Sequence, residues 1–143
     1  MRRVLAPALL VAAVVVAFFP ALRAEFLHWD DNYVLTENPS WRGLGAAQLG
    51  WMLTTLHMGH YQPLTWLSFA ADHALWGMDP RGYHLTNVAL HAANAVLVWA
   101  LAGAIFRLGE GNARPAAVFL AALLWALHPL RVRIGDRRSG YPD

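Results

Sequence analysis

The sequence contains no cysteine, which excludes disulfide bonds, thiolate nucleophiles and cysteine-based metal sites. It also lacks lysine, so all eleven basic side chains are arginines, and these occur singly or in pairs. A continuous basic stripe is typical of proteins that bind nucleic acid, and we therefore expect no nucleic-acid partner. Charged residues make up only 14% of the chain, which argues against an ordinary water-soluble domain.

Apolar residues are abundant instead. They make up 57% of the 143 residues, and seven tryptophans and four tyrosines accompany them. Tryptophan and tyrosine are enriched where a membrane meets water, because each has an apolar ring with a polar group. The composition therefore predicts an all-α integral membrane protein, which would have membrane lipid as a partner.

The first apolar stretch, 4–22, carries no charge and follows Arg2 and Arg3. At about 1.5 Å per residue, a helix of this length can cross a hydrocarbon layer about 30 Å thick. A cleaved signal peptide begins in the same way, with Ala24 as the residue before the cut. However, the stretch is longer than a signal core, and Leu22 stands where a small residue is needed, so we expect an uncleaved anchor.

A second stretch, 85–106, carries a polar stripe. At 100° per helical residue, four polar side chains fall within an arc of about 80°. They are His84, Asn87, His91 and Asn94. Such a stripe faces protein or a water-filled cavity, because lipid offers polar groups no partners. Interhelical hydrogen bonding and the lining of a substrate cavity both remain open as its role.

The apolar stretch 115–130 is a third spanning candidate, although it is shorter than the ~20 residues that a full span prefers. The complete organisation that we expect is an anchor at 1–23, an external loop at 24–83, a spanning helix at 84–106, a cytoplasmic link at 107–114, a third spanning helix at 115–130 and a divergent tail at 131–143. Arginines near 1–23 and 107–114 predict a cytoplasmic N-terminus. The four arginines of the tail contradict this orientation if the third stretch spans.

Two helices are expected within the external loop. One has an apolar stripe made of Leu49, Met52, Leu53 and Leu56. The other covers 63–76, with Pro63 at its start and Gly77 after its end. Both are too short to span, so we expect them to lie on the outer membrane interface as a lid. The expected interfacial anchors are Trp29, Trp41, Trp51, Trp66 and Trp76.

An acidic pair, Asp30 and Asp31, lies in the segment 26–39, FLHWDDNYVLTENP. If 4–22 spans the membrane, the pair lies just outside it, where a lipid-borne and a water-borne substrate can meet. Adjacent acids followed by asparagine are also typical of solvated turns and helix N-caps. The pair therefore allows a catalytic and a purely structural interpretation.

Four ordered blocks together resemble a known family. They are WDDNYVLTENP, YQPLTWLSFAADHALWG, YHLTNVALHAANAVL and LLWALHPLRV. Over 8–132 the chain resembles the N-terminal membrane region of the tetratricopeptide-repeat protein O-mannosyltransferase-like family, especially its bacterial members. The resemblance implies a fragment of a glycosyltransferase C fold, in which many membrane helices support transfer of a sugar from a polyprenyl- or dolichyl-phosphate carrier. For a bacterial member it also implies the inner membrane, with the loop in the periplasm.

The resemblance also implies roles for particular residues. Asp30 and Asp31 match the family's acidic pair, of which one acts as catalytic base toward an acceptor protein's hydroxyl group. His84, Asn87 and His91 are second candidates, for lining the cavity of the polyprenyl-phosphate-linked sugar, which is mannose or a similar sugar. A divalent metal ion could assist the leaving phosphate, but the residues predict no metal site of their own.

One block departs from the family pattern. The family has His-Pro, then three residues, then Glu; here His128-Pro129 is followed by Arg133 at the Glu position. The rest of the tail no longer resembles the family, and complete members have further membrane helices and repeats. We therefore expect a truncated or frame-shifted product, and a non-catalytic membrane module is the alternative to an active enzyme.

Cofactor binding by histidine is a weaker alternative. His84 and His91 lie two turns apart on one predicted helix face, but b-type haem usually takes one histidine from each of two facing helices, and no second pair is present. Zinc binding through His57 and His60 lacks further spaced ligands. No haem is expected.

Overall fold

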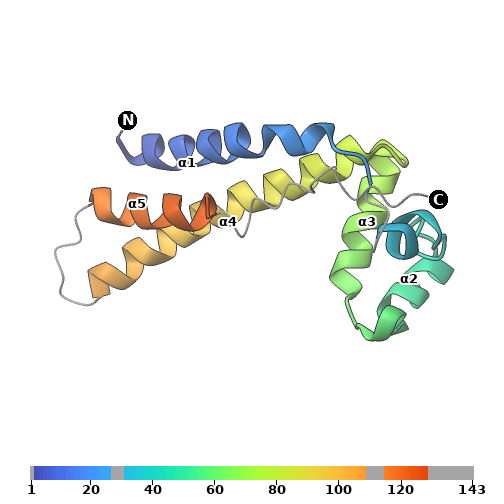
Figure 1. Ribbon diagram of the computed structural model, residues 1–143. Coiled ribbons are helices and arrows are strands. Elements are labelled where there is room, and N and C mark those ends of the chain that lie inside the picture. Colours follow the sequence, from blue (N-terminus) through green and yellow to red (C-terminus); the bar gives the residue numbers. More distant parts are fainter. Residues whose placement is uncertain (1, 27–30, 109–114, 129–143) are drawn as a thin grey trace. The chain divides into compact units, whose positions relative to one another are not determined.

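The computed structural model describes residues 2–26, 31–108 and 115–128. Within these ranges the chain is helical and contains no strand, so the all-α prediction is confirmed there. The elements in order are α1 (Arg2–Phe18), the 3-10 helix η1 (Phe19–Arg23), the π-helical η2 (Asn32–Thr36), α2 (Ala46–Thr54), the 3-10 turn η3 (His57–Gly59), α3 (Pro63–Trp76), α4 (Pro80–Leu108) and α5 (Pro115–Ala126) (Figure 1).

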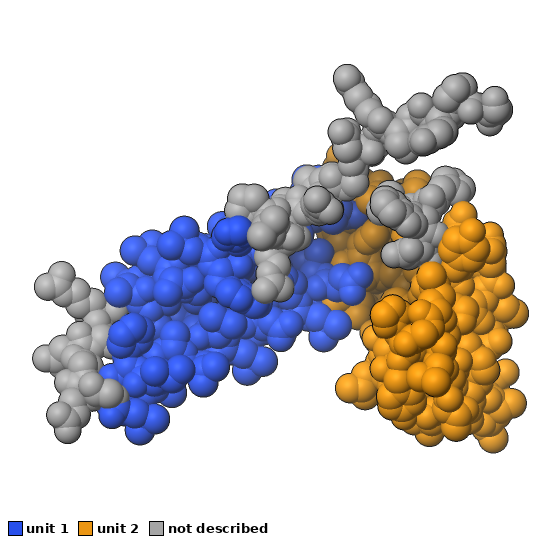
Figure 2. All heavy atoms as spheres, turned by 60° about the horizontal axis from the view of Figure 1, so that its bottom comes forward, with its two compact units in different colours: residues 1–21, 87–143 blue, residues 22–86 orange. Residues whose placement is uncertain are grey.

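The chain forms two compact units (Figure 2). Unit 2 is the continuous segment Leu22–Thr86, which contains the acidic segment, α2 and α3. Unit 1 combines Met1–Ala21 with Asn87–Asp143, and so contains α1, most of α4 and α5. The loop that separates the first two apolar stretches is therefore an organised unit with a core of its own.

Small and β-branched residues fill the contacts within unit 1. The buried apolar positions among the described residues are Leu10 and Val14 on α1, Val88, Ala92 and Ala95 on α4, and Val118, Ala122 and Ala126 on α5. Small side chains allow helix backbones to approach closely, and an added Cβ on Gly103 of α4 would lie 3.8 Å from Val118. The large apolar side chains instead lie exposed on the outer faces; they include Val4, Val16, Leu97, Leu101, Leu120 and Leu124. An apolar exterior of this kind is suited to lipid.

Among the described residues, two helices are long and apolar enough to cross a membrane, Val4–Arg23 and Pro80–Leu108. They agree with the first two predicted spans, although α4 begins before the expected start at 84. The third predicted span is shorter than expected, because α5 ends at Ala126 after 12 residues. A third membrane crossing therefore stays a prediction.

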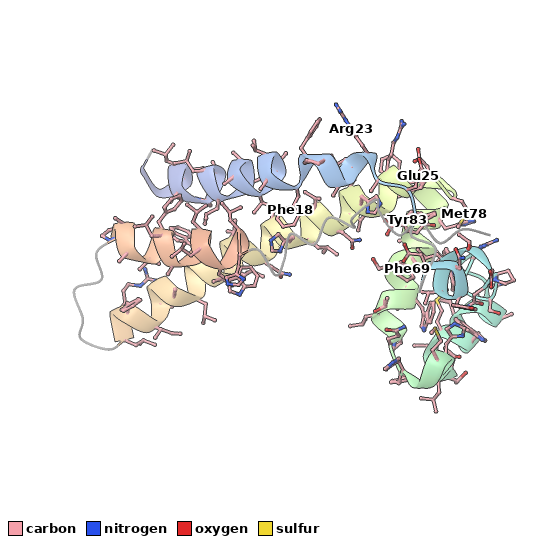
Figure 3. All side chains as sticks on the ribbon, viewed as in Figure 1. Phe18, Arg23, Glu25, Phe69, Met78 and Tyr83 are labelled. Atoms are coloured by element: carbon pink, nitrogen blue, oxygen red, sulfur yellow. The ribbon has the colours of Figure 1, made fainter. Side chains whose placement is uncertain are left out.

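An aromatic core holds unit 2 together. Its buried members are Leu35, Trp41, Met52, Trp66, Ala70 and Tyr83. Phe69 and Met78 pack against this core, and Figure 3 shows them beside Tyr83. Trp51 and Trp66 lie edge to face with ring centroids 5.0 Å apart, a favourable geometry for aromatic pairs.

The expected role of the loop tryptophans is partly wrong. Trp41 and Trp66 are completely buried in the core of unit 2, so they are not available to a membrane interface. Trp76 is 44% exposed and Trp51 is partly buried, while Trp29 lies outside the described residues. Burial of the indole rings, rather than anchoring at the interface, is therefore the main use of tryptophan in this unit.

The two predicted loop helices differ in how well they match the structure. α3 has the predicted bounds, with Pro63 in its first turn and Gly77 after its end at φ 61°. α2 ends at Thr54, so Leu56 lies beyond it, and both Leu53 and Leu56 are exposed. The predicted apolar stripe therefore contributes only its first half, Leu49 and Met52, to the core.

Gly82 is required by close packing within unit 2. An added Cβ at this buried position would overlap Cβ and Cγ of Trp76, which cannot swing away as a flexible side-chain end could. Replacing Gly82 by alanine is therefore expected to lower the free energy of unfolding by about 1–3 kcal/mol, as overpacking usually does. Chemical denaturation in detergent, followed by tryptophan fluorescence, measures this change.

Gly50→Ala is the matched control for Gly82→Ala. Gly50 lies inside α2, and an added Cβ there meets no atom within 4 Å. Because alanine favours a helix over glycine, this variant should gain up to ~1 kcal/mol. Equal stability changes in the two variants would contradict the packing role of Gly82.

Candidate functional site

The acidic segment, 26–39, lies within unit 2 and contains the short helix η2. Asp30 lies outside the described residues. Asp31 occupies the N-cap position of η2 with helical backbone angles, φ −61° and ψ −30°, and is partly buried. Asp31 thus directly precedes a helix, but its side chain makes no capping hydrogen bond, and its catalytic role stays a prediction.

Contacts from distant residues fix η2 in place. The Arg42 guanidinium donates hydrogen bonds to the backbone oxygens of Leu35 (3.0 Å) and Thr36 (2.7 Å). The last carbonyls of a helix lack partners within the helix, and a cation there also suits the negative end of the helix dipole. The His57 ring bonds through Nε2 to the backbone oxygen of Tyr33 at 3.2 Å. The helix that follows Asp31 is thus held by two side chains from later in the sequence.

A hollow of about 440 Å³ lies beside the C-terminal end of η2. It is lined by Tyr33, Glu37, Asn38, Pro39, His57 and Met58. Sequence reasoning missed this set as a site, because His57 and Met58 are some 20 residues away from the acidic segment in the chain. The Glu-Asn-Pro sequence at 37–39 was the available signal, since asparagine before proline favours a turn.

His91 is used in helix packing. Its Nε2 lies 3.0 Å from the backbone oxygen of Ala126, its ring stacks on Trp125 at 5.6 Å, and Phe18 meets it edge-on at 4.9 Å. These contacts join α1, α4 and α5 within unit 1. Of the two roles left open for the polar stripe, interhelical hydrogen bonding is therefore observed for His91.

The other predicted cavity residues are distributed differently. Asn87 and Asn94 are exposed in unit 1. His84 belongs to unit 2, where its Nε2 is buried and has no hydrogen-bond partner among the described residues. None of His84, Asn87 and His91 lines the hollow beside η2, so their substrate role stays a prediction.

A buried acid that the sequence did not single out is Asp72 on α3. It is 4% exposed, and its carboxylate accepts a hydrogen bond from the Thr86 hydroxyl. This contact ties α3 to the start of α4 within unit 2. Because a buried carboxylate without a donor is costly, we interpret Asp72 as structural.

The described residues alone do not form a divalent-metal site. Within 2–26, 31–108 and 115–128, no group of three or more His, Asp or Glu side chains could hold a metal ion. Hard divalent cations need several oxygen ligands, and the described residues do not bring such a group together. Asp30 lies outside the described residues.

Comparison with known proteins identifies relatives of one kind. Protein O-mannosyl-transferase TMTC2 of Mus musculus is 34% identical over 121 residues, which cover 79% of this chain and 14% of the relative. Protein O-mannosyl-transferase TMTC1 of Mus musculus is 33% identical over 138 residues, which cover 87% of this chain and 14% of the relative. Protein O-mannosyl-transferase tmtc2 of Xenopus laevis is 31% identical over 134 residues, which cover 88% of this chain and 15% of the relative.

No family model and no solved structure matches the chain. The chain spans only 14% to 15% of the length of these three relatives. Their names agree with the resemblance seen in the sequence, whereas its bacterial type and the truncation stay predictions. The chain is thus a homologue of one segment of the TMTC protein O-mannosyl-transferases.

Proposed function

We propose that the chain is a membrane-embedded segment of a glycosyltransferase. In this proposal, mannose or a similar sugar moves from a polyprenyl-phosphate carrier to a protein hydroxyl group. The observation that carries the proposal is similarity to proteins named protein O-mannosyl-transferases over 79% of this chain or more. It is supported by two helices with the length and composition of membrane spans, which precede and follow the acidic segment.

The proposed chemistry assigns one of Asp30 and Asp31 as the general base. The acceptor oxygen forms a bond to the anomeric carbon, while the bond from that carbon to the phosphate oxygen breaks and its electron pair leaves with the phosphate. The hydroxyl proton passes to the carboxylate. A hydroxyl group is a weak nucleophile near neutral pH, so a positioned base is useful here. The second carboxylate would orient the first or the acceptor.

The proposed topology places this chemistry outside the cytoplasm. Arg2 and Arg3 precede α1, and positively charged residues favour the cytoplasmic side. The acidic segment would then face the periplasm if the protein belongs to a bacterial inner membrane. There the carboxylates would be close to the lipid that carries the sugar, while an acceptor protein approaches from the water.

A chimera tests this proposal, because the chain matches only part of its relatives. The chain would replace the corresponding segment of mouse TMTC2, and membranes would be assayed for transfer of labelled mannose to protein. We expect the chimera to retain transfer, because its four sequence blocks supply the acidic segment and its supporting helices. A TMTC2 variant with that segment deleted gives the background level of label transfer.

The assay also distinguishes an active glycosyltransferase segment from a non-catalytic membrane module. A chimera that inserts into membranes but transfers no more label than the deleted variant would contradict the proposed function. That result is the one expected of a non-catalytic membrane module. Insertion is checked independently by protease protection of the loop.

A further inference from the structure

Unit 2 contains a long stretch of sequence without formal charge. From Gly43 to Ala71 the chain has no arginine, lysine, aspartate or glutamate, and this stretch includes α2, η3 and most of α3. Surfaces that face water normally carry charged side chains of both signs at frequent intervals. The absence of charge therefore indicates that part of this stretch faces something other than water.

The turn that joins α2 to α3 exposes large apolar side chains (Figure 1). Met52 and Trp66, which flank the turn in the sequence, are completely buried in the core of unit 2. Between them, five apolar or aromatic side chains are 52% to 80% exposed, and we call this set the apolar tip: Leu53, Leu56, Met58, Tyr61 and Leu64. Exposed apolar patches in folded proteins usually mark a surface that contacts a partner or a membrane.

Hydrogen bonds within the turn suit its backbone to an apolar environment. The Gly59 N–H donates to the Leu56 oxygen at 3.0 Å. The Tyr61 hydroxyl donates to the Leu53 oxygen at 2.9 Å, and so satisfies a carbonyl in the last turn of α2. Backbone groups that approach lipid need partners of this kind, because lipid supplies none. The apolar tip therefore presents apolar side chains on a backbone that is already hydrogen-bonded.

The connections of unit 2 favour the bilayer as the partner of the apolar tip. Unit 2 runs from Leu22 to Thr86, and the helices at its two ends, Val4–Arg23 and Pro80–Leu108, are long and apolar enough to cross a membrane. In the proposed topology, both ends tie unit 2 to the membrane surface. A tethered surface is present at a high effective concentration, whereas a protein partner has to arrive from solution. A bilayer also matches the missing charge, because ionised side chains are costly in lipid.

A nearby acid limits how far the apolar tip can enter. Glu37 is exposed and lines the hollow beside η2 together with Met58. A carboxylate is stable in water or among lipid head groups, but it is costly in hydrocarbon. Insertion is therefore shallow, at the boundary between head groups and acyl chains.

We propose that the apolar tip inserts into the bilayer that the helices of this chain span. The turn between α2 and α3 enters first, to a depth of about 5–10 Å at the boundary between head groups and acyl chains. This contact differs from the one expected from the sequence, in which tryptophans anchor both helices along the surface. The inference rests on the membrane spans of the proposed function, but not on sugar transfer.

Spin labelling of the full chain in phosphatidylcholine nanodiscs tests the inference, because the chain has no cysteine of its own. Leu56→Cys places a nitroxide on the apolar tip, and Ala46→Cys places one at the opposite end of α2; both positions are exposed. Collisions with oxygen and with a water-soluble nickel complex measure the depth of each label. We expect a depth of about 5–10 Å for Leu56→Cys and a label in water for Ala46→Cys.

Two results with these labels would overturn the proposal. One is a Leu56→Cys label that is as accessible to nickel as the Ala46→Cys label and lies in water, which would leave the apolar tip free for a protein partner. The other is the same shallow depth at both positions, which is expected if α2 lies flat on the membrane.

Leu97→Cys separates this inference from the proposed membrane spans. Leu97 is exposed on α4, and its label should lie in hydrocarbon if α4 crosses the bilayer. A Leu97→Cys label in water would overturn the spans and the inference together. A Leu97→Cys label in hydrocarbon with a Leu56→Cys label in water would overturn only the insertion of the apolar tip.

Matched charge variants locate the contact. In the Leu56→Cys background, Leu64→Glu should move the label into water, because a carboxylate on the apolar tip is costly in lipid. Leu64 is exposed in the first turn of α3, where an acid favours the helix, so unfolding would not explain the change. Leu75→Glu makes the same change at an exposed position in the last turn of α3 and should leave the depth unchanged. Equal shifts in the two variants would contradict insertion through the turn.

Discussion

If Asp31 is the general base of the pair, replacing it by asparagine is expected to lower mannose transfer by about 10²- to 10⁴-fold in the chimera that carries this chain. Asparagine has nearly the same shape but cannot accept the proton of the acceptor hydroxyl. Asp31 begins η2, which Arg42 and His57 hold in place, so the amide should occupy the position of the carboxylate. The rate of label transfer at saturating acceptor measures the loss.

Two further variants make this result specific. Asp30→Asn identifies which member of the pair is the base, because only the base should give a loss of this size. Glu25→Gln removes an exposed carboxylate before the pair and should leave transfer unchanged. Membrane insertion should be equal in all variants. Full transfer by both Asp30→Asn and Asp31→Asn would contradict the catalytic assignment of the pair.

Trp41→Ala should reduce the free energy of unfolding by about 3–5 kcal/mol, the usual result of deleting a large buried aromatic side chain. Trp41 is completely buried, and its ring lies 5.9 Å from Phe69, 5.6 Å from His73 and 6.5 Å from Tyr83, measured between centroids. Its Nε1 also donates a hydrogen bond to the Val34 oxygen at 2.9 Å. Urea denaturation in detergent, followed by near-UV circular dichroism, measures the loss.

Two tryptophan variants serve as comparisons. Trp41→Phe keeps an aromatic ring but leaves the Val34 oxygen without its donor, so a smaller loss of about 1–3 kcal/mol is expected. Trp76→Ala truncates a ring that is 44% exposed and should also cost less than Trp41→Ala. If Trp41→Ala were no more destabilising than Trp76→Ala, Trp41 could not be central to the core of unit 2.

Local sequence signals predicted the helices well. Pro63 begins α3 and Gly77 follows it, and both act through backbone restrictions that do not depend on the rest of the fold. The long apolar runs likewise predicted α1 and α4, because length and composition alone decide whether a helix can cross a membrane. The acidic segment was noticed for its composition, and Asp31 does begin a helix.

What the sequence could not predict depends on contacts between distant residues. Tryptophan suits both a membrane interface and a packed core, so only the fold reveals that Trp41 and Trp66 are buried. His91 could have lined a cavity, and its use in packing depends on Trp125 and Ala126, 34 and 35 residues later in the chain. The hollow beside η2 requires His57 to reach Tyr33 across 24 positions of sequence.

The order in which the two units become complete follows from how they divide the chain. Unit 2 is continuous from Leu22 to Thr86, so all its partners are present once that segment has been synthesised. The contact of α1 with α5 instead joins helices separated by roughly 100 residues, and long-range contacts of this kind form late. During synthesis in a membrane, α1 would have to remain stable in lipid without α5. Its uncharged stretch from Val4 to Leu22 meets that requirement by length and composition, and in the proposed membrane topology the bilayer is then the first folding partner of α1.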